Sequence, residues 1–189
     1  MQLVLASSST RRRELLKNAG FEFEVCPSKV QEVRRPGEIP EDYARRAARE
    51  KALDVAASRG PGTLVLGADT VVDCDGQILG KPVSPDDAAR MLRLLSGRAH
   101  RVITGVCLVQ APALVEVLDY ETTFVTFRQL DVEEIRAYVR SREPFDKAGA
   151  YGIQGLASRF VTRISGCYFN VVGLPVPLVY EVLKPYLKG

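Results

Sequence analysis

The sequence contains a single histidine and four cysteines, and no two of the cysteines have CxxC spacing. A zinc site built from cysteine and histidine is therefore not expected. The single imidazole, His100, lies at the predicted start of a strand, so we expect it to be structural and not the base of a reaction. Unpaired cysteines are by default reduced thiols, which indicates a cytoplasmic protein.

Long apolar runs are also missing. No stretch approaches about 18 consecutive apolar residues, so no membrane span is expected. The N-terminal apolar run is short and has no basic region ahead of it, which is not typical of a signal peptide. The net charge is +3 over 189 residues. A nucleic-acid binder is usually more basic, with aromatic residues among its charges, so we expect no stable nucleic-acid binding. Small polyanions remain attractive partners.

What the chain does have is an alternation of apolar strand and helix patterns. The hydrophobic fraction of 46% is ordinary for a globular protein. The alternation predicts the α/β class, as one domain over residues 1–189, with a mixed twisted sheet and flanking helices. We expect strands at 2–6, 21–26, 63–66, 70–72, 77–79, 99–109, 114–128, 160–164 and 167–172. We expect helices at 11–19, 41–58, 85–95, 131–139 and 177–187.

Residues 64–82 are the centre of the pattern. The apolar run 63–66 stops at Gly67 and delivers one carboxylate, Asp69, and a hairpin through 73–76 leads back to Lys81. In α/β proteins, ligands bind at the carboxyl ends of buried strands. A carboxylate and an ammonium there suit a metal-bound phosphate. The alternative is a solvated aspartate and a surface lysine.

A serine-rich turn at Ser7–Ser9 joins the first strand to the helix at 11–19, for which Ser9 or Thr10 is a natural N-cap. Such a turn offers N–H groups and hydroxyls at a helix N-terminus, which is an anion site. Arg11 and Arg12 lie in the first helical turn, where the helix dipole disfavours cations. Their placement indicates a bound anion. The alternative is a pair of solvated arginines on a capped helix.

Two further features point to the same kind of ligand. Lys51 lies in an alanine stripe on the inward face of the helix at 41–58, and a buried ammonium needs a partner. We expect it to point into a cleft that holds an anion, with snorkelling to the helix edge as the alternative. The irregular stretch 27–40 carries Glu32 near its middle, and loops of this length are often functional.

The stretch 143–155 is polar and ends in three glycines and a glutamine within seven residues. This composition predicts a backbone packed closely against other groups, or else a plain glycine-rich connector. Gln154 presents a carbonyl and an NH₂ group side by side.

Taken together, these segments resemble the Maf family of nucleoside triphosphate pyrophosphatases. The likeness lies in residues 5–12, 48–52, 67–72, 80–82, 146–155 and 170–175, in order and over nearly the full length. The resemblance implies an α/β fold with a deep cleft between two lobes. It also implies hydrolysis of a nucleoside triphosphate to the monophosphate and pyrophosphate, assisted by Mg²⁺ or Mn²⁺, as nucleotide-pool housekeeping. The 151–155 segment is similar to the subgroup that acts on dTTP and UTP. Thr10 stands where the family usually has proline, and we expect little change from it.

By this resemblance Asp69 corresponds to the family's proton acceptor, and Arg11, Thr70 and Gln154 correspond to positions associated with base preference. The Gln154 amide would complement N3–H and a ring carbonyl of uracil or thymine, and a flipped amide would serve cytosine as well. The other expected substrate-binding residues are Ser7, Ser9, Arg12, Lys51 and Lys81. Glu32 and Asp69, with phosphate oxygens, suit a hard cation such as Mg²⁺. Asp69 would take the proton of water directly or hold the metal that activates it.

Several alternatives stay open at this point. The substrate could be a purine triphosphate or 7-methyl-GTP. The chain could be a nucleotide- or nucleic-acid-binding regulator without turnover, which would have no need for Asp69 and Glu32 beside the cations. It could also be a structural module, in which case Lys51 should pair with a core acid. A homodimer through the long hairpin at 99–128 is a candidate assembly.

Overall fold

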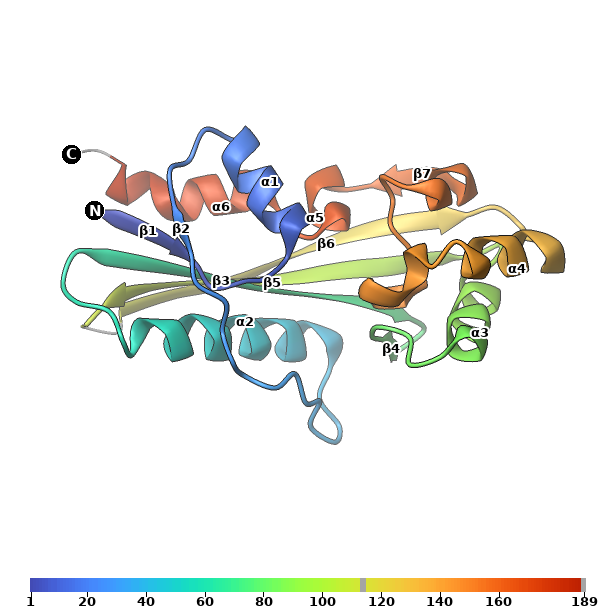
Figure 1. Ribbon diagram of the computed structural model, residues 1–189, viewed down its shortest axis with the longest axis horizontal. Helices are drawn as coiled ribbons and strands as arrows, with labels where there is room; N and C mark the ends of the chain where they lie inside the picture. Colours follow the sequence, from blue (N-terminus) through green and yellow to red (C-terminus); the bar gives the residue numbers. More distant parts are fainter. Residues whose placement is uncertain (113–114, 188–189) are drawn as a thin grey trace. The chain divides into compact units, whose positions relative to one another are not determined.

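The computed structural model describes residues 1–112 and 115–187 (Figure 1). Its sheet has the strand order β2-β1-β3-β5-β6-β7, and β4 pairs with β3. The strands are β1 (Gln2–Leu5), β2 (Glu24–Val25), β3 (Thr63–Cys74), β4 (Gln77–Leu79), β5 (Ala99–Ala111), β6 (Val115–Phe127) and β7 (Val161–Ser165). The α-helices are α1 (Thr10–Asn18), α2 (Pro40–Ala56), α3 (Pro85–Leu95), α4 (Val132–Arg140), α5 (Tyr168–Val172) and α6 (Val176–Leu183). Short 3₁₀ turns are η1 (Glu143–Asp146), η2 (Ala148–Ala150), η3 (Leu156–Phe160) and η4 (Lys184–Tyr186).

The sheet is mixed, as predicted. β1 is parallel to β2 and β3, whereas β4 is antiparallel to β3 and β7 is antiparallel to β6. The helices flank it, so the α/β class with a mixed sheet is confirmed. The deep cleft stays a prediction. Among the described residues, no helix is both long and apolar enough to cross a membrane.

The chain forms two compact units. The first comprises 1–70, 104–121 and the chain from 173 onward, and the second comprises 71–103 and 122–172. β3, β5 and β6 therefore contribute residues to both units. Their treatment as one domain over 1–189 stays a prediction.

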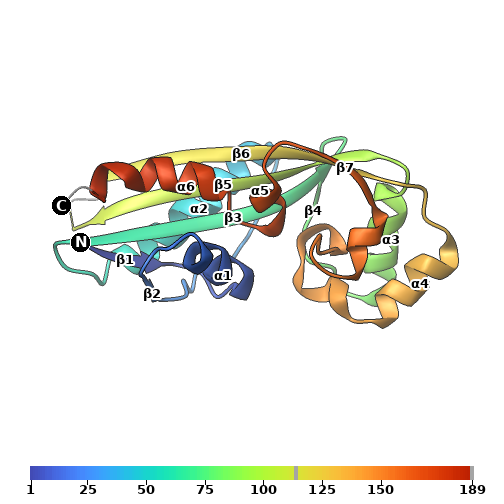
Figure 2. The ribbon, with the colours of Figure 1, turned by 90° about the horizontal axis from the view of Figure 1, so that it is seen from above.

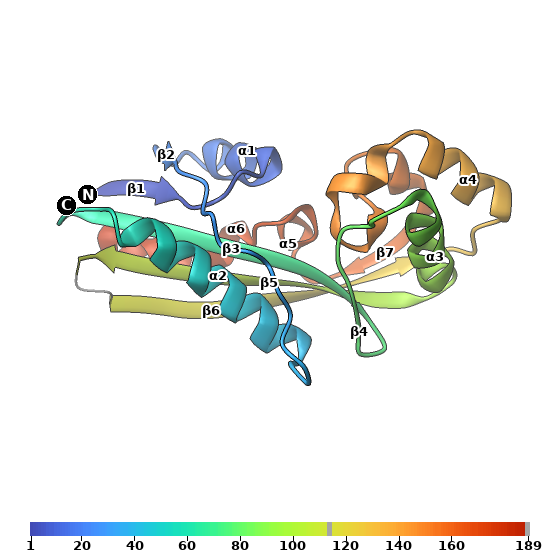
Figure 3. The same ribbon diagram turned by 60° about the horizontal axis from the view of Figure 1, so that its bottom comes forward.

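In the first unit, α2 lies on one face of β3 and β5, and α1 and α6 lie on the other (Figures 1 and 3). The alanine stripe of α2 is buried against the sheet, as its spacing predicted. Gly67 explains how closely the layers meet, because a Cβ added there would lie 2.2 Å from the backbone oxygen of Ala48. A glycine on β3 thus makes room for the backbone of α2.

This close approach corrects one expectation. We expected the buried strand to end at Gly67 and to deliver Asp69 from its end. Instead β3 runs unbroken from Thr63 to Cys74, and Asp69 lies inside it. Gly67 serves helix packing and not a turn, and a single sequence does not separate these two uses of glycine.

In the second unit, α3 and α4 lie side by side (Figure 2). Both helices begin after a side chain that caps them. Ser84 accepts a hydrogen bond from the backbone of Asp87, and Asp131 forms a capping box with Glu134. His100 is buried, and its Nε2 lies 2.8 Å from the hydroxyl of Tyr151. The imidazole has the structural place that was expected.

Two strand predictions fail. The strand expected at 21–26 is only β2, two residues long. The strand expected at 167–172 is helix α5. There the buried Asn170 amide donates to the oxygen of Val102 at 2.9 Å and to Oγ1 of Thr123 at 3.1 Å. These long-range bonds outweigh the strand preference of the valines beside Asn170. Part of the hairpin connection expected around 111–114 lies outside the described residues.

Candidate active site

The candidate site lies beyond the carboxyl end of β1. Leu5, the last residue of β1, pairs with Leu66, and β3 continues past that point to Asp69 and Thr70. The Ser7–Ser9 turn and the start of α1 follow directly from the same end of β1, beside β3 (Figure 2). A helix N-terminus at the carboxyl end of a parallel strand is where α/β proteins bind ligands and anions.

The first cluster is built on Lys51 of α2. Its Nζ donates to Oδ1 of Asp69 at 2.6 Å and to Oε1 of Glu32 at 2.5 Å. Lys51 is 7% exposed and Asp69 is 5% exposed. The side chain of Glu32 is 43% exposed. One ammonium therefore joins a buried carboxylate to one that faces solvent.

The segment between β2 and α2 passes across α2 (Figure 1) and brings Glu32 to Lys51. The segment is hydrogen-bonded to α2 on both sides of Glu32. Asp54 accepts a hydrogen bond from the backbone of Lys29 at 2.9 Å. Arg46 donates to both oxygens of Glu38, at 2.6 and 2.7 Å, and this pairing raises the pKa of Arg46 and lowers that of Glu38. Glu32 lies between these two attachments.

The second cluster is built on Arg12 of α1, which is 9% exposed. Its Nε donates to the oxygen of Gly173 at 2.8 Å, Nη1 donates to Oγ of Ser7 at 3.2 Å, and Nη2 donates to Oγ1 of Thr70 at 2.9 Å. Thr70 Oγ1 also lies 2.9 Å from Oγ1 of Thr104. The guanidinium thus ties the serine turn to β3 and to the chain after α5.

Burial and neighbouring charges set the electrostatics of both clusters. Burial raises the pKa of Asp69, and the positive charges of Lys51 and Arg12 offset part of that rise. Burial likewise lowers the pKa of Arg12, and Asp69 and Glu32 oppose this change. The formal charges of these four side chains cancel. A highly charged anion would therefore need further positive charge to bind here.

The oxygen donors fit a divalent cation that is shared with a ligand. In residues 1–112 and 115–187, no group of three or more histidine, cysteine, aspartate or glutamate side chains could hold a metal. Asp69 and Glu32 supply only oxygen, which suits Mg²⁺, and this ion is usually bound by one or two carboxylates with waters and phosphates. The pair fits a metal that arrives with a phosphate group and does not form a protein cage.

The remaining predicted residues have clear positions. Ser9 is the N-cap of α1, and its Oγ accepts from the backbone of Arg12 at 3.4 Å. Arg11 is partly exposed in the first turn of α1. Lys81 follows β4, and Gln154 is exposed on a turn, both in the second unit.

In the first unit the structure brings six predicted residues into the two clusters, namely Ser7, Arg12, Glu32, Lys51, Asp69 and Thr70. Sequence reasoning missed Thr104 and the carbonyl of Gly173. Thr104 stands in an apolar strand and gave no signal. Gly173 belongs to the segment 170–175, which had been noted only as part of the resemblance.

Lys51 does pair with a core acid, as a purely structural module would require. Its buried partner, however, is Asp69, the predicted proton acceptor, and it also holds the half-exposed Glu32. A structural pair has no need of that second, solvent-facing carboxylate. The pairing is compatible with a structural module and with an enzyme, and comparison with related proteins distinguishes the two.

The model of the family described as Maf-like protein matches residues 2–186. The chain belongs to the Maf family. Three curated relatives of this Maf-family chain carry the name dTTP/UTP pyrophosphatase. The relative from Koribacter versatilis is 53% identical, over 97% of this chain and 94% of its own. The relative from Syntrophomonas wolfei is 51% identical, over 95% and 94%. The relative from Carboxydothermus hydrogenoformans is 48% identical, over 98% and 99%.

Solved structures share the fold of this Maf-family chain at low identity. The Ham1 protein of Staphylococcus aureus has a TM-score of 0.56 at 13% identity and covers 98% of this chain and 100% of its own. A HAM1 protein from Coxiella burnetii has a TM-score of 0.52 at 15% identity and covers 98% and 99%. These two likenesses support the mixed α/β architecture.

Proposed function

We propose that this Maf-family chain hydrolyses nucleoside triphosphates to the monophosphate and pyrophosphate, and that dTTP and UTP are its preferred substrates. The observation that carries the proposal is the buried Asp69 beside Lys51 and Arg12 at the end of β1. It is found in a chain about half identical to several proteins named dTTP/UTP pyrophosphatase. The cellular role would be removal of unwanted pyrimidine nucleotides in the cytoplasm.

In the proposed reaction, a water oxygen bonds to phosphorus while the anhydride bond between the α- and β-phosphates breaks. Asp69 would take the proton that the water loses, or would instead hold the metal that activates this water, and the leaving group takes the bonding electron pair. A general base works best when its pKa approaches the working pH, and burial moves the pKa of Asp69 in that direction. Lys51 holds Oδ1 of the carboxylate and so fixes its orientation.

The triphosphate carries about four negative charges, which the transition state redistributes over phosphate oxygens. Because the charges of Asp69, Glu32, Lys51 and Arg12 cancel, we propose that a divalent cation is required. Mg²⁺ or Mn²⁺ held by Asp69 and Glu32 would neutralise phosphate charge when bound. Arg11, Lys81 and the serine turn would add further donors to the phosphates.

Base preference is assigned to three residues, following the resemblance. Gln154 would hydrogen-bond N3–H and a ring carbonyl of uracil or thymine through its amide. Arg11 and Thr70 correspond to the other two positions associated with base preference. Thr70 already contacts Arg12 through its hydroxyl, so its side chain is fixed before any substrate binds.

A panel of triphosphates tests the proposal. Pyrophosphate release is measured for UTP, dTTP, CTP, ITP and 7-methyl-GTP, each with and without Mg²⁺. We expect release from UTP and dTTP, dependence on Mg²⁺, and a loss of about 10²–10⁴-fold in kcat for Asp69→Asn in a protein that stays folded. Fastest turnover of ITP or 7-methyl-GTP would replace the substrate assignment. Binding without any release would favour the regulator instead.

The assembly is a separate proposal. The length of the β5–β6 hairpin is what suggests a homodimer, and sedimentation of the purified chain tests it. Stable binding to nucleic acid is not expected at a net charge of +3. A steep salt dependence of DNA binding would contradict that expectation.

A further inference from the structure

Gln154 lies on a turn in the second unit whose backbone is unusually well held. The N–H of Gly155 donates to the oxygen of Gly152 at 3.1 Å, which closes the turn around Ile153 and Gln154. The side chain of Ile153 is buried, at 7% exposure, whereas Gln154 is exposed. The turn therefore anchors one side chain and presents the other.

The two ends of this turn are linked to the carboxylate of Glu143, the first residue of η1, one of them directly and the other through Tyr138. Oε2 of Glu143 accepts from the N–H of Leu156 at 2.9 Å. Oε1 accepts from the hydroxyl of Tyr138 at 2.8 Å, and the same hydroxyl accepts from the N–H of Gly152 at 3.3 Å. One carboxylate thus holds the end of the turn directly and its beginning through Tyr138.

The glycines of the turn allow Glu143 and Lys147 to lie close to its backbone. A Cβ added to Gly155 would lie 2.3 Å from Oε1 of Glu143, and one added to Gly152 would lie 2.5 Å from Cε of Lys147. Lys147 in turn donates from Nζ to the backbone oxygen of Glu143 at 2.7 Å. Side chains at 152 and 155 would therefore displace the Lys147 and Glu143 side chains from their places against the turn.

Tyr138 gives this arrangement a rigid base. It comes from α4, its side chain is fully buried, and its ring meets that of Phe160 edge-on at 5.2 Å. Burial raises the pKa of Tyr138, and the bond to Glu143 raises it further, so the hydroxyl stays protonated and remains a donor. A donor fixed in this way determines which oxygen of Glu143 is left for the backbone of Leu156.

We propose that Glu143 is a positioning residue for base selection, because it fixes the turn that presents Gln154. This inference rests on the proposed function, in which Gln154 hydrogen-bonds the base. Glu143 itself needs no contact with substrate. Its carboxylate would set the direction of the Gln154 amide, and so the difference in binding between uracil or thymine and cytosine.

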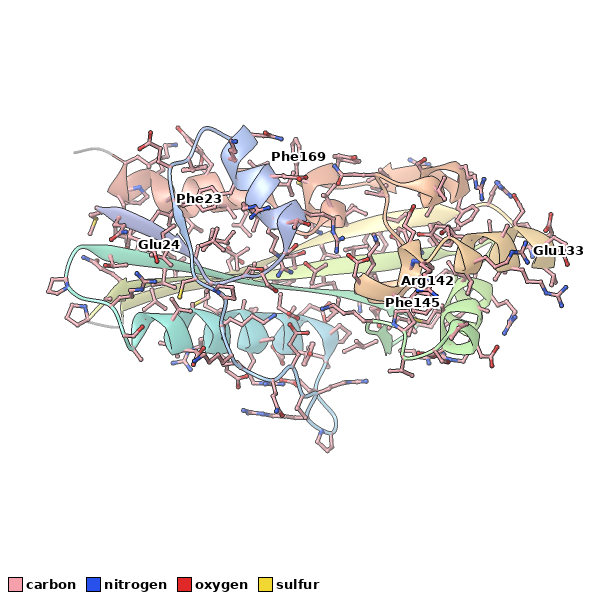
Figure 4. The ribbon with its side chains drawn as sticks, viewed as in Figure 1. Phe23, Glu24, Glu133, Arg142, Phe145 and Phe169 are labelled. Atoms are coloured by element: carbon pink, nitrogen blue, oxygen red, sulfur yellow. The ribbon has the colours of Figure 1, made fainter. Side chains whose placement is uncertain are left out.

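Glu143→Gln and Tyr138→Phe test the proposal. Glutamine at 143 keeps one acceptor and loses the other, and phenylalanine at 138 keeps the ring and loses the hydroxyl. Glu133→Gln is the matched control, since Glu133 lies on the exposed side of α4, where its carboxylate pairs with Arg136 (Figure 4). The values of kcat and KM are measured for UTP and CTP. Thermal melting confirms that each variant is folded.

We expect the UTP:CTP ratio of kcat/KM to fall about tenfold in Glu143→Gln, mainly through a higher KM for UTP, and by a smaller factor in Tyr138→Phe. Glu133→Gln should keep the ratio of the unmodified protein. A merely structural role would lower kcat/KM for UTP and for CTP by the same factor and leave their ratio unchanged. That result would overturn the proposal.

The double variant Glu143→Gln/Gln154→Ala separates this inference from the proposed function. If Glu143 acts through Gln154, the double variant has the ratio of Gln154→Ala alone, whereas independent effects would multiply and reject the inference. A Gln154→Ala variant with an unchanged ratio would reject base recognition at this turn, and the role of Glu143 with it. No release from any triphosphate would reject the proposed function itself.

Discussion

Replacing Lys51 with methionine should show how much the Lys51 ammonium stabilises the folded protein by pairing with Asp69 and Glu32. Methionine keeps the length and the apolar character of the side chain and removes its charge. Asp69 then stays in place at 5% exposure without its hydrogen-bond partner. Glu32, which is half-exposed, can turn towards water instead. The free energy of unfolding should therefore fall, and mainly because of Asp69.

The size of the loss follows from the geometry. At a distance of 2.6 Å between Nζ of Lys51 and Oδ1 of Asp69, two unit charges attract by about 6 kcal/mol if the effective dielectric constant is about 20. Part of this lost attraction is offset, because the variant no longer has the cost of burying the Lys51 ammonium away from water. Breaking a buried pair from one side commonly lowers the free energy of unfolding by about 3–5 kcal/mol. That is a large share of a typical stability of about 5–15 kcal/mol.

The loss should also depend on pH in a definite direction. Burial already raises the pKa of Asp69, and removal of Lys51 takes away the largest effect that lowers it. When the folded pKa of a carboxyl group lies above the unfolded value of about 3.9, the unfolded state loses its proton first as the pH rises. Stability then falls with increasing pH above that value. The variant should be closest to the unmodified protein near pH 4 and furthest from it near pH 7.

Urea unfolding at pH 4.5 and 7.5, followed by circular dichroism, measures both effects. Lys184→Met is the matched control, because Lys184 and its partner Glu181 are 49% and 63% exposed and an exposed pair contributes about 0–1 kcal/mol. Adding Asp69→Asn to Lys51→Met should restore much of the loss at pH 7.5. A loss below about 1 kcal/mol, or one that does not change with pH, would refute the reasoning.

Three further predictions concern the surrounding framework, each read by urea unfolding. Thr70→Val removes the acceptor of Nη2 of the buried Arg12 and should lower the free energy of unfolding by about 1–3 kcal/mol. Gly67→Ala places a Cβ 2.2 Å from the backbone of α2 and should lower it by about 1–3 kcal/mol or more, whereas Gly60→Ala, with nothing within 4 Å, should stay within about 0.5 kcal/mol. Burial lowers the pKa of His100 to about 4, so the stability that depends on this residue should rise from pH 4 to about 6.5, and His100→Gln should flatten that part of the profile.

Each of these has an outcome that would contradict it. Thr70→Ser retains a hydroxyl, so a loss as large as that of Thr70→Val would mean that the hydrogen bond to Arg12 is not the cause. Equal losses for Gly67→Ala and Gly60→Ala would mean that α2 does not need the space above Gly67. An unchanged profile between pH 4 and 6.5 in His100→Gln would assign the slope to other groups.

The sequence was informative where local chemistry decides the structure. The helix starts at Ser9, Ser84 and Asp131 follow from side chains that accept backbone hydrogen bonds within one turn. The burial of Lys51 followed from its place among alanines. Its partners did not, because Glu32 and Asp69 lie 19 and 18 residues away along the chain. No local pattern records such a contact.

The failures have a common physical origin. Gly67 looked like the end of a strand, but its role is set by the backbone of α2, which a single strand pattern does not contain. Residues 167–172 looked like a strand, but Asn170 is held by acceptors on β5 and β6. The contacts of Arg12 with Ser7, Thr70 and Gly173 were not expected either, although its role in substrate binding stays a prediction. Long-range partners decided the outcome each time.

The attachment of the segment that carries Glu32 has a consequence for the proposed metal. Nε and Nη2 of Arg46 donate to the two carboxylate oxygens of Glu38, which lies in the same segment. Arg46→Lys would keep the positive charge but would not form both hydrogen bonds, so the segment would be held less firmly. If Glu32 helps to hold a divalent cation, as proposed, this variant would need a higher magnesium concentration for half-maximal turnover, although no proposed substrate-binding residue is changed.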